Sequence, residues 1–230
     1  MGSESPFTED LSTVTLITFS ISGNSNIVFN EGNNIQTISE AKNVLSAAST
    51  VEDFPQNFGI YDLNEFLNVL GLVDVPNLTF EKDYVLISDS SGRSKVKYFF
   101  SDPDMLTSPS KKIVMPQCEV QFDLDGNTLS RIKRAAAALG HDEVSITPGD
   151  GVLTLSVVDS KNATSNTFSI DIAGDYPAEA FNFVISISNL KIIPGDYHVA
   201  ISSKLISEFS NNELGVSYWI ALEKSSTYGE

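Results

Sequence analysis

The sequence predicts an α+β fold of two similar, strand-rich domains. Most of the chain consists of short segments that are rich in β-branched and aromatic residues and end at Gly, Asn, Asp or Pro, as strands commonly do. Few segments have helical periodicity, and the order strand, short helix and two further strands recurs in both halves. At 230 residues, the chain is long enough to bury a substantial core.

The expected strands are short and are spread along almost the whole chain. Their β-branched and aromatic side chains favour a pleated, half-buried surface. They lie at residues 26–30, 58–61, 84–89, 95–100, 143–147, 152–159, 167–173, 181–186, 197–202 and 216–223.

The clearest amphipathic helix is predicted at residues 62–73, DLNEFLNVLGLV. The stripe of this helix that should face solvent is polar, with Asn64, Glu65 and Asn68 at the spacing of one helix face. Asp62 is expected to cap the first turn. The apolar stripe that should face a core consists of Leu63, Phe66, Leu67, Leu70 and Val73.

A second helix, here called the basic helix, is predicted at residues 129–140, LSRIKRAAAALG. Arg131 and Arg134 project from the side opposite to its apolar residues, and Lys133 lies on a flank. Asp125 or Asn127 can cap its start, and Gly140 can end it. A solvated face is the ordinary explanation of such cations. The expected packed side consists of Leu129, Ile132, Ala136 and Leu139.

Two further helices are expected from weaker signals. A short helical turn is predicted at residues 186–191, SISNLK, before Pro194-Gly195. Residues 11–22 are rich in β-branched side chains, which favours a strand, but the internal repeat favours a helix with Leu11, Val14 and Ile17 on one stripe. We expect a helix there.

The proline-rich segment at residues 101–117 divides the strand-rich sequence into two similar parts. We therefore expect a first domain over residues 1–104, a connector over 105–117 and a second domain over 118–230.

The overall charge restricts how this chain could bind nucleic acid. It has 14 basic and 30 acidic side chains and a formal net charge of −16. Phosphates would on average be repelled, so a nucleic-acid role requires cations gathered in one place. No apolar run is long enough for a membrane helix, the first ten residues do not resemble a secretion signal, and we expect a soluble protein that is not exported.

The residues that usually support catalysis are scarce. The two histidines, His141 and His198, lie after a helix-ending glycine and in an expected strand, which favours structural or surface positions. Cys118 is the single cysteine and has no histidine close in the sequence. No phosphate-binding loop, nucleophile elbow or metal-binding motif is present. We expect no enzymatic activity, no cofactor and no metal site.

Three blocks of sequence stand out, at residues 58–73, 180–202 and 216–226. Their most specific parts are Tyr-Asp-Leu-Asn-x-Phe-Leu at residues 61–67 and Asn-Leu-Lys-x-x-Pro-Gly-Asp-Tyr at residues 189–197. In these blocks the chain resembles the DNA polymerase sliding clamps of T-even-type bacteriophages. The resemblance covers most of the chain but is strong only in these blocks.

This resemblance implies a DNA clamp (processivity) fold in which each strand-rich domain has two inward-facing helices. Three copies would close head-to-tail into a ring around duplex DNA and act as a processivity factor in the cytoplasm of the infected bacterial host. The residues implied to face the DNA are Arg131, Lys133 and Arg134 on the basic helix, and Lys191 on the short helix at 186–191.

The resemblance also implies partner proteins: a replicative DNA polymerase and an ATP-driven clamp loader. Exposed apolar residues commonly mark docking sites. We expect Leu106, Ile113, Val114 and Met115 in the connector to receive the polymerase, although the same residues could instead seal the joint between the domains.

Two other functions remain open at this point. An acidic, β-rich structural protein of a phage, such as a tail or decoration subunit, would share the charge and the repeat but would need no cationic inner face. A hydrolase with dispersed carboxylates is a third possibility.

Overall fold

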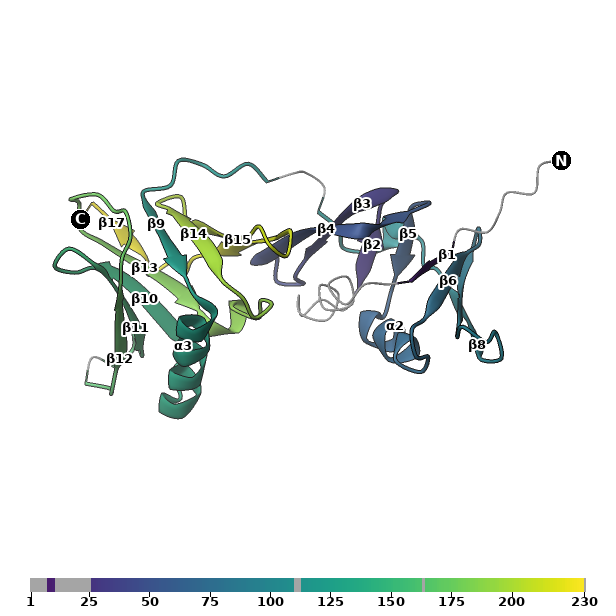
Figure 1. Ribbon diagram of the computed structural model, residues 1–230. Helices are drawn as coiled ribbons and strands as arrows, with labels where there is room; N and C mark the ends of the chain where they lie inside the picture. The colour runs from purple at the N-terminus through teal and green to yellow at the C-terminus, as the bar shows by residue number, and fades with distance from the viewer. Residues whose placement is uncertain (1–7, 11–25, 110–112, 163, 230) are drawn as a thin grey trace. The chain divides into compact units, whose positions relative to one another are not determined.

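The computed structural model describes residues 8–10, 26–109, 113–162 and 164–229 (Figure 1). The helix expected at residues 11–22 lies outside the described residues. The chain divides into two compact units, Met1–Ser110 and Lys111–Glu230, here called unit 1 and unit 2.

Unit 1 contains two antiparallel groups of strands. In one group the order is β5-β2-β3-β4; in the other it is β1-β6-β7-β8. The first group consists of β2 (Ile27–Phe29), β3 (Gly32–Ile38), β4 (Val44–Phe54) and β5 (Phe58–Ile60). The second consists of β1 (Thr8–Asp10), β6 (Asn77–Phe80), β7 (Tyr84–Ser88) and β8 (Lys95–Phe99).

Helix α2 (Leu63–Leu70) packs its apolar stripe into the core of unit 1. The Asp62 side chain accepts a hydrogen bond from the backbone N–H of Glu65 at 2.9 Å, which is the predicted cap. Phe66 is buried and lies edge-on to Tyr98 of β8, with ring centroids 5.1 Å apart. Aromatic rings dominate the rest of this core: Phe58 stacks on Phe29 and on Phe100, at centroid distances of 4.4 and 4.6 Å.

Unit 2 repeats this plan, and its second group has five strands where the described part of unit 1 has four. One group has the order β16-β15-β14-β9, and the other has the order β12-β11-β10-β13-β17. The first consists of β9 (Val120–Leu124), β14 (Tyr197–Ser202), β15 (Ile206–Asn211) and β16 (Val216–Ala221). The second consists of β10 (Glu143–Pro148), β11 (Leu153–Val158), β12 (Phe168–Ile172), β13 (Phe181–Ser186) and β17 (Thr227–Tyr228).

The described part of each unit has one α-helix and one short 3₁₀ helix. Unit 2 has α3 (Gly126–Leu139) and η2 (Ile187–Asn189), and unit 1 has α2 and η1 (Pro103–Met105). The turn predicted at residues 186–191 is therefore present as η2, but it ends before Lys191. The placement of Lys191 on a helix was wrong, because Ile192 and Ile193 turn inward and are buried, which ends the turn.

All the expected strands are present within one or two residues of their predicted ends, and several strands were missed. Those missed contain many small or polar residues: β1, β3, β4, β6, β9, β15 and β17. Strand β4 alternates buried and exposed positions over much of VLSAASTVEDF. Within the described ranges, no helix combines the length and the hydropathy that crossing a membrane requires.

We predict that replacing Phe66 with Ala destabilises unit 1 by about 3–5 kcal/mol, because it removes a buried ring and leaves a cavity against Tyr98. Urea unfolding followed by far-ultraviolet circular dichroism would measure this. Asn68→Ala is the matched control: Asn68 is exposed on the same helix, and its replacement should cost less than about 0.5 kcal/mol. Equal costs for the two variants would contradict the packing of α2.

Candidate nucleic-acid interface

Helix α3 begins at an aspartate cap that accepts two hydrogen bonds. The carboxylate of Asp125 accepts hydrogen bonds from the backbone N–H and the hydroxyl of Thr128, at 2.8 and 2.7 Å. These bonds, the one from the hydroxyl first, hold the pKa of Asp125 below its ordinary value. The predicted choice between Asp125 and Asn127 is thus resolved in favour of Asp125, and the helix starts three residues earlier than expected.

A segment far along the chain also fixes the start of α3. Asp196 accepts a hydrogen bond from the backbone N–H of Gly126 at 2.7 Å, across 70 residues of sequence. Gly126 leaves little room for a side chain, since a Cβ there would lie 3.1 Å from the carbonyl oxygen of Gly195. The Pro-Gly-Asp-Tyr part of the motif at residues 189–197 therefore positions this helix.

Buried tyrosines hold that segment in place. The Tyr197 hydroxyl donates to the carbonyl of Ile193 at 2.6 Å, and the Ile193 N–H donates to the Tyr218 hydroxyl at 3.3 Å. Burial raises the pKa of Tyr218 to about 12 and also raises the pKa of Tyr197. Both hydroxyls therefore stay protonated at neutral pH and act as hydrogen-bonding groups of the core.

The end of α3 is a glycine in the left-handed conformation. Gly140 has φ +70°, and the next backbone N–H, of His141, donates to the carbonyl of Ala136 at 3.0 Å. This bond is the one that closes a Schellman motif. Both ends of the helix are thus fixed by hydrogen bonds, which leaves little freedom to rotate its faces.

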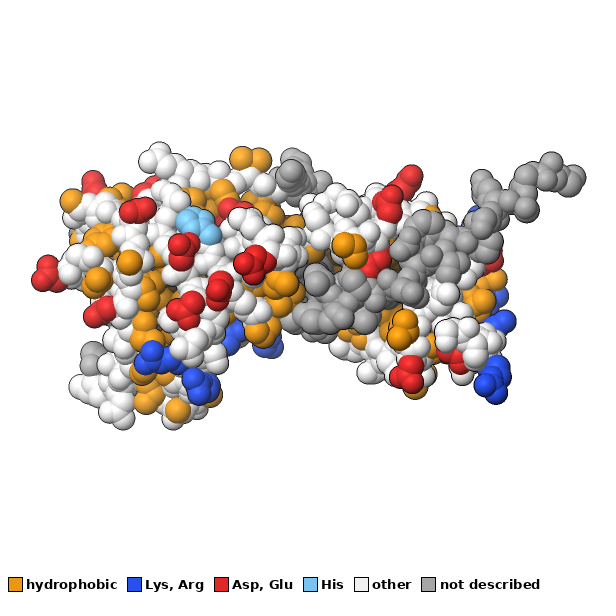
Figure 2. All heavy atoms as spheres, in the orientation of Figure 1, with side chains coloured by type: hydrophobic (Ala, Val, Ile, Leu, Met, Phe, Trp, Pro, Cys, Tyr) orange, Lys and Arg blue, Asp and Glu red, His pale blue; other side chains and the backbone are white. Residues whose placement is uncertain are grey.

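The two faces of α3 are those predicted from its sequence. Leu129, Ile132 and Ala136 are buried. Arg131 and Arg134 are exposed, and Lys133 is half-buried, so desolvation lowers the pKa of its ammonium group. Figure 2 shows Lys and Arg side chains gathered around the position of α3, with Asp and Glu side chains over the rest of unit 2 on that face. The structure thus brings three of the four proposed DNA-facing residues together.

The four proposed DNA-facing cations have different surroundings. The guanidinium carbon of Arg131 lies 5.8 Å from the ring centroid of Phe168 on β12, within cation–π range. Lys133 and Arg134 border a groove of about 290 Å³ that also includes Ala137 and Pro194. Lys191 is exposed in the segment between η2 and β14, off the helix.

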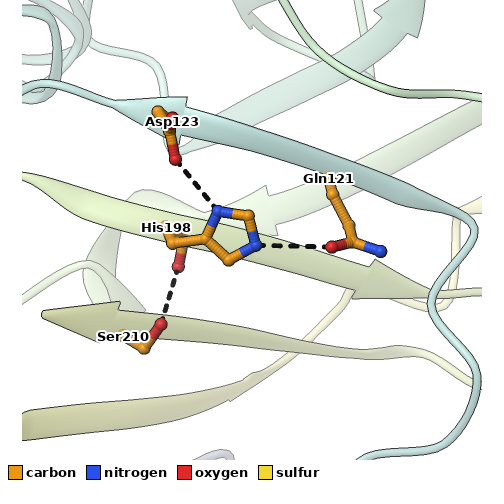
Figure 3. A network of polar contacts seen from close by, with 4 residues as sticks. All are labelled: Gln121, Asp123, His198 and Ser210. Atoms are coloured by element: carbon orange, nitrogen blue, oxygen red, sulfur yellow. Dashed lines mark hydrogen bonds and ion pairs between the residues drawn. The ribbon is translucent and has the colours of Figure 1, made fainter. Parts of the chain in front are cut away.

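The polar network around His198 is a set of contacts across a sheet (Figure 3). Its Nδ1 lies 2.9 Å from a carboxylate oxygen of Asp123, and its Nε2 lies 3.4 Å from the amide oxygen of Gln121. Ser210 donates its hydroxyl proton to the backbone carbonyl of His198 and not to the imidazole. The serine is therefore not activated as a nucleophile, which agrees with a structural role for His198.

Comparison with known proteins connects these features to a family. A family profile described as gp45 sliding clamp, C terminal, matches residues 121–224. The sliding clamp of Vibrio phage KVP40 is 30% identical over 205 residues, which cover 87% of this chain and 91% of that protein. This chain belongs to the phage sliding clamp family. The sliding clamps of Escherichia phage RB69 and Enterobacteria phage T4 are 29% and 27% identical, over 94% and 89% of this chain and 96% and 92% of theirs.

Solved structures confirm the predicted clamp fold. The proliferating cellular nuclear antigen of Entamoeba histolytica matches with a TM-score of 0.66 and 15% identity, covering 95% of this chain and 99% of that one. The H. pylori beta clamp, solved in complex with 5-chloroisatin, matches with a TM-score of 0.70 and 12% identity, covering 97% of this chain and 68% of that one.

The four connector residues of this clamp have different environments. Val114 is 85% exposed, whereas Leu106, Ile113 and Met115 are half-buried. Leu106 packs so closely on Gly59 that a Cβ there would lie 2.6 Å from its Cδ1. Leu106 therefore seals part of unit 1. Met105 was not predicted among the exposed apolar residues of the connector, but it is 84% exposed. Nothing in the sequence distinguishes Met105 from Leu106, its neighbour that packs inward.

We predict that Asp125→Ala destabilises this clamp by about 1 kcal/mol, because the first turn of α3 loses its cap, whereas Asp125→Asn stays close to wild type. Urea unfolding at pH 7 would measure both. The folded-state pKa of Asp125 is depressed, so its stabilisation is complete above about pH 4 and is lost as the pH falls further. The wild type should therefore lose stability relative to Asp125→Asn below that pH; parallel pH profiles would contradict the cap.

Proposed function

We propose that this clamp is a non-enzymatic processivity factor. Three copies close head-to-tail into a ring that encircles duplex DNA and tethers a replicative DNA polymerase. The membership of the sliding clamp family supports the class of function. The observation that supports DNA encirclement in this chain is the cationic face of α3, formed by Arg131, Lys133 and Arg134 on a strongly acidic protein.

Screening explains how an acidic ring can hold DNA. At physiological ionic strength, charges more than about 8 Å away are largely screened. A duplex in the ring would feel the cations that line the hole more than the carboxylates on the rim. The acidic exterior, with a net charge of −16 per copy, would also discourage binding of DNA from outside.

The exposed side chains of α3 suit a ring that slides along DNA better than one that binds a fixed site. Besides Arg131 and Arg134, the exposed residues of α3 are Asn127, Ser130, Ala137 and Ala138, so that one amide and one hydroxyl are the uncharged side-chain groups that could read base edges. Arginine and lysine contacts to phosphates are independent of sequence, so the ring could move along the duplex without pausing at particular sites.

We also propose the domain division expected from the sequence, with clamp domains at 1–104 and 118–230 and a connector at 105–117. Within the connector, Ile113, Val114 and Met115 are the candidates to receive the polymerase, and Leu106 contributes less because it already packs on Gly59. Lys191 would add a further phosphate contact. An ATP-driven loader would open the ring, and the site of action would be the cytoplasm of the infected host.

Reversing two cations tests this function. We predict that Arg131→Glu with Arg134→Glu reduces retention on nicked circular DNA after loading. The salt dependence of binding should also fall, by about one unit of slope for each phosphate that is no longer neutralised. The assembled mass should not change, because both side chains are exposed on α3. Gel filtration of loaded, nicked circular DNA at several salt concentrations would measure retention.

The matched control is Lys204→Glu with Lys224→Glu, which makes the same charge change at exposed positions of unit 2 away from α3. It should retain DNA as the wild type does. Linearising the DNA should release the wild-type ring through the ends. Retention that is indifferent to DNA topology would favour the alternative of a phage structural protein, and equal reductions in the two reversed variants would contradict the role of α3.

A further inference from the structure

Most of the cations of unit 1 lie in one short stretch of the chain. Residues 1–110 contain five lysines and arginines, and four of them fall within the segment 81–99: Lys82, Arg93, Lys95 and Lys97. All four are exposed, and Figure 2 shows Lys and Arg side chains at the β8 side of unit 1. Four cations against three carboxylates give this segment a formal charge of +1, in a chain whose net charge is −16. The segment is thus the cationic part of unit 1.

Strands β7 and β8 have one face in the core of unit 1 and one face toward solvent. Val85 and Ile87 of β7 are buried in that core, and Val96 and Tyr98 of β8 pack against it. The alternate side chains point the other way, because successive residues of a strand face opposite sides of the sheet. This second surface, here called the basic-aromatic face, consists of Tyr84, Leu86, Ser88, Lys95, Lys97 and Phe99.

Two rings and a lysine form the centre of the basic-aromatic face. Tyr84 and Phe99 lie opposite each other on the two strands, with ring centroids 5.7 Å apart. The Lys97 ammonium lies 3.8 Å from the centroid of Tyr84 and 4.8 Å from that of Phe99, within cation–π range. Phe99 is nevertheless 62% exposed. A cation is thus held beside an aromatic ring that the described part of the chain leaves open to solvent.

The carboxylates of the same segment lie in the turns at either end of β7. Asp89 accepts hydrogen bonds from a hydroxyl and two backbone N–H groups of its own turn, at 2.8, 3.1 and 3.3 Å. Glu81 and Asp83 lie in the turn that precedes the strand. Among the described residues, neither Lys95 nor Lys97 forms an ion pair with a carboxylate. Both lysines are therefore available to an anionic partner.

We propose that the basic-aromatic face binds an acidic segment of another protein, one that carries an apolar side chain next to its carboxylates. The carboxylates would pair with Lys95 and Lys97, and the apolar side chain would cover Phe99. These three residues occupy every second position of β8, so they follow one another at intervals of about 7 Å. An extended segment whose acidic and apolar residues have the same spacing would match all three.

The position of Lys97 favours a carboxylate over a nucleic acid. Bases bind exposed aromatic residues by stacking on ring faces, and a base could stack on Tyr84 only by displacing the ammonium that lies 3.8 Å from its centroid. A carboxylate can bind the ammonium where it is. A nucleic-acid strand would also extend from this face over the acidic remainder of the protein, which repels phosphates. A short acidic segment that ends within the face avoids that repulsion.

This partner-binding surface lies on unit 1, apart from the connector residues that are proposed to receive the polymerase. All its residues belong to β7 or β8. Side chains stand roughly perpendicular to a sheet, so the basic-aromatic face stays accessible whichever strand pairs with the edge of β8. Binding of the acidic partner can therefore be measured separately from assembly of the ring.

The test is binding of an acidic peptide to the full chain. The probe is a fluorescein-labelled peptide of alternating glutamate and serine with one central phenylalanine, and fluorescence anisotropy at low salt measures its binding. Lys95→Gln with Lys97→Gln should weaken binding about tenfold, since two charge-assisted contacts are lost. Phe99→Ser should weaken it as well, because the apolar contact is removed. Replacing the glutamates of the peptide with glutamine should abolish binding, and added salt should reduce it.

The matched control is Lys204→Gln with Lys224→Gln, which removes the same charge at exposed positions of unit 2. It should bind the peptide as the wild type does. Circular dichroism melts would verify that every variant folds. Full-strength binding by the folded Lys95→Gln, Lys97→Gln chain, an equal loss in the control, or no binding by the wild type would overturn the proposal. A labelled oligothymidylate that binds this face more tightly than the peptide would overturn it too, because the face would then be a nucleic-acid site.

Discussion

The packing of one face of α3 into unit 2 is the constraint on which the rest of the account depends. With Leu129, Ile132 and Ala136 buried, the helix cannot rotate, and Arg131 and Arg134 must point to solvent. A net charge of −16 would otherwise keep phosphates away. Cations fixed in one place produce a local field that attracts phosphates, and the proposed encirclement of DNA would then require only weak contacts.

The segment at residues 189–197 shows how a recognisable motif can serve function indirectly. Asp196 binds the backbone at the start of α3, and Tyr197 anchors the segment to the core. Neither side chain needs to touch DNA. A resemblance that is strong in only a few blocks is therefore informative, because one of those blocks contains residues that orient α3.

Local patterns predicted α2 and α3 well because the signals that start and end each helix lie in the sequence next to it. Asp62, Asp125 and Gly140 are signals within a few residues of the helix ends that they fix. The strands β4 and β9 were missed because small and polar residues in them have little strand propensity of their own. These residues form strands through pairing with β3 and β14, which the local pattern of side chains does not show. Lys191 was misplaced because burial of Ile192 and Ile193 ended the turn early. That β8 and β12 are the terminal strands of their sheets could not be predicted, because the sheet order depends on pairing between strands far apart in the sequence.

Topology, rather than affinity, is the basis of the proposed function, and imaging of the assembled particle tests this. Electron microscopy of the wild-type chain at a concentration where it is fully assembled should show a three-fold ring with a hole wide enough for a double helix. The α3 helices should line that hole, with Arg131 and Arg134 facing it. A particle without such a hole, or one with both arginines on the outer rim, would contradict the account.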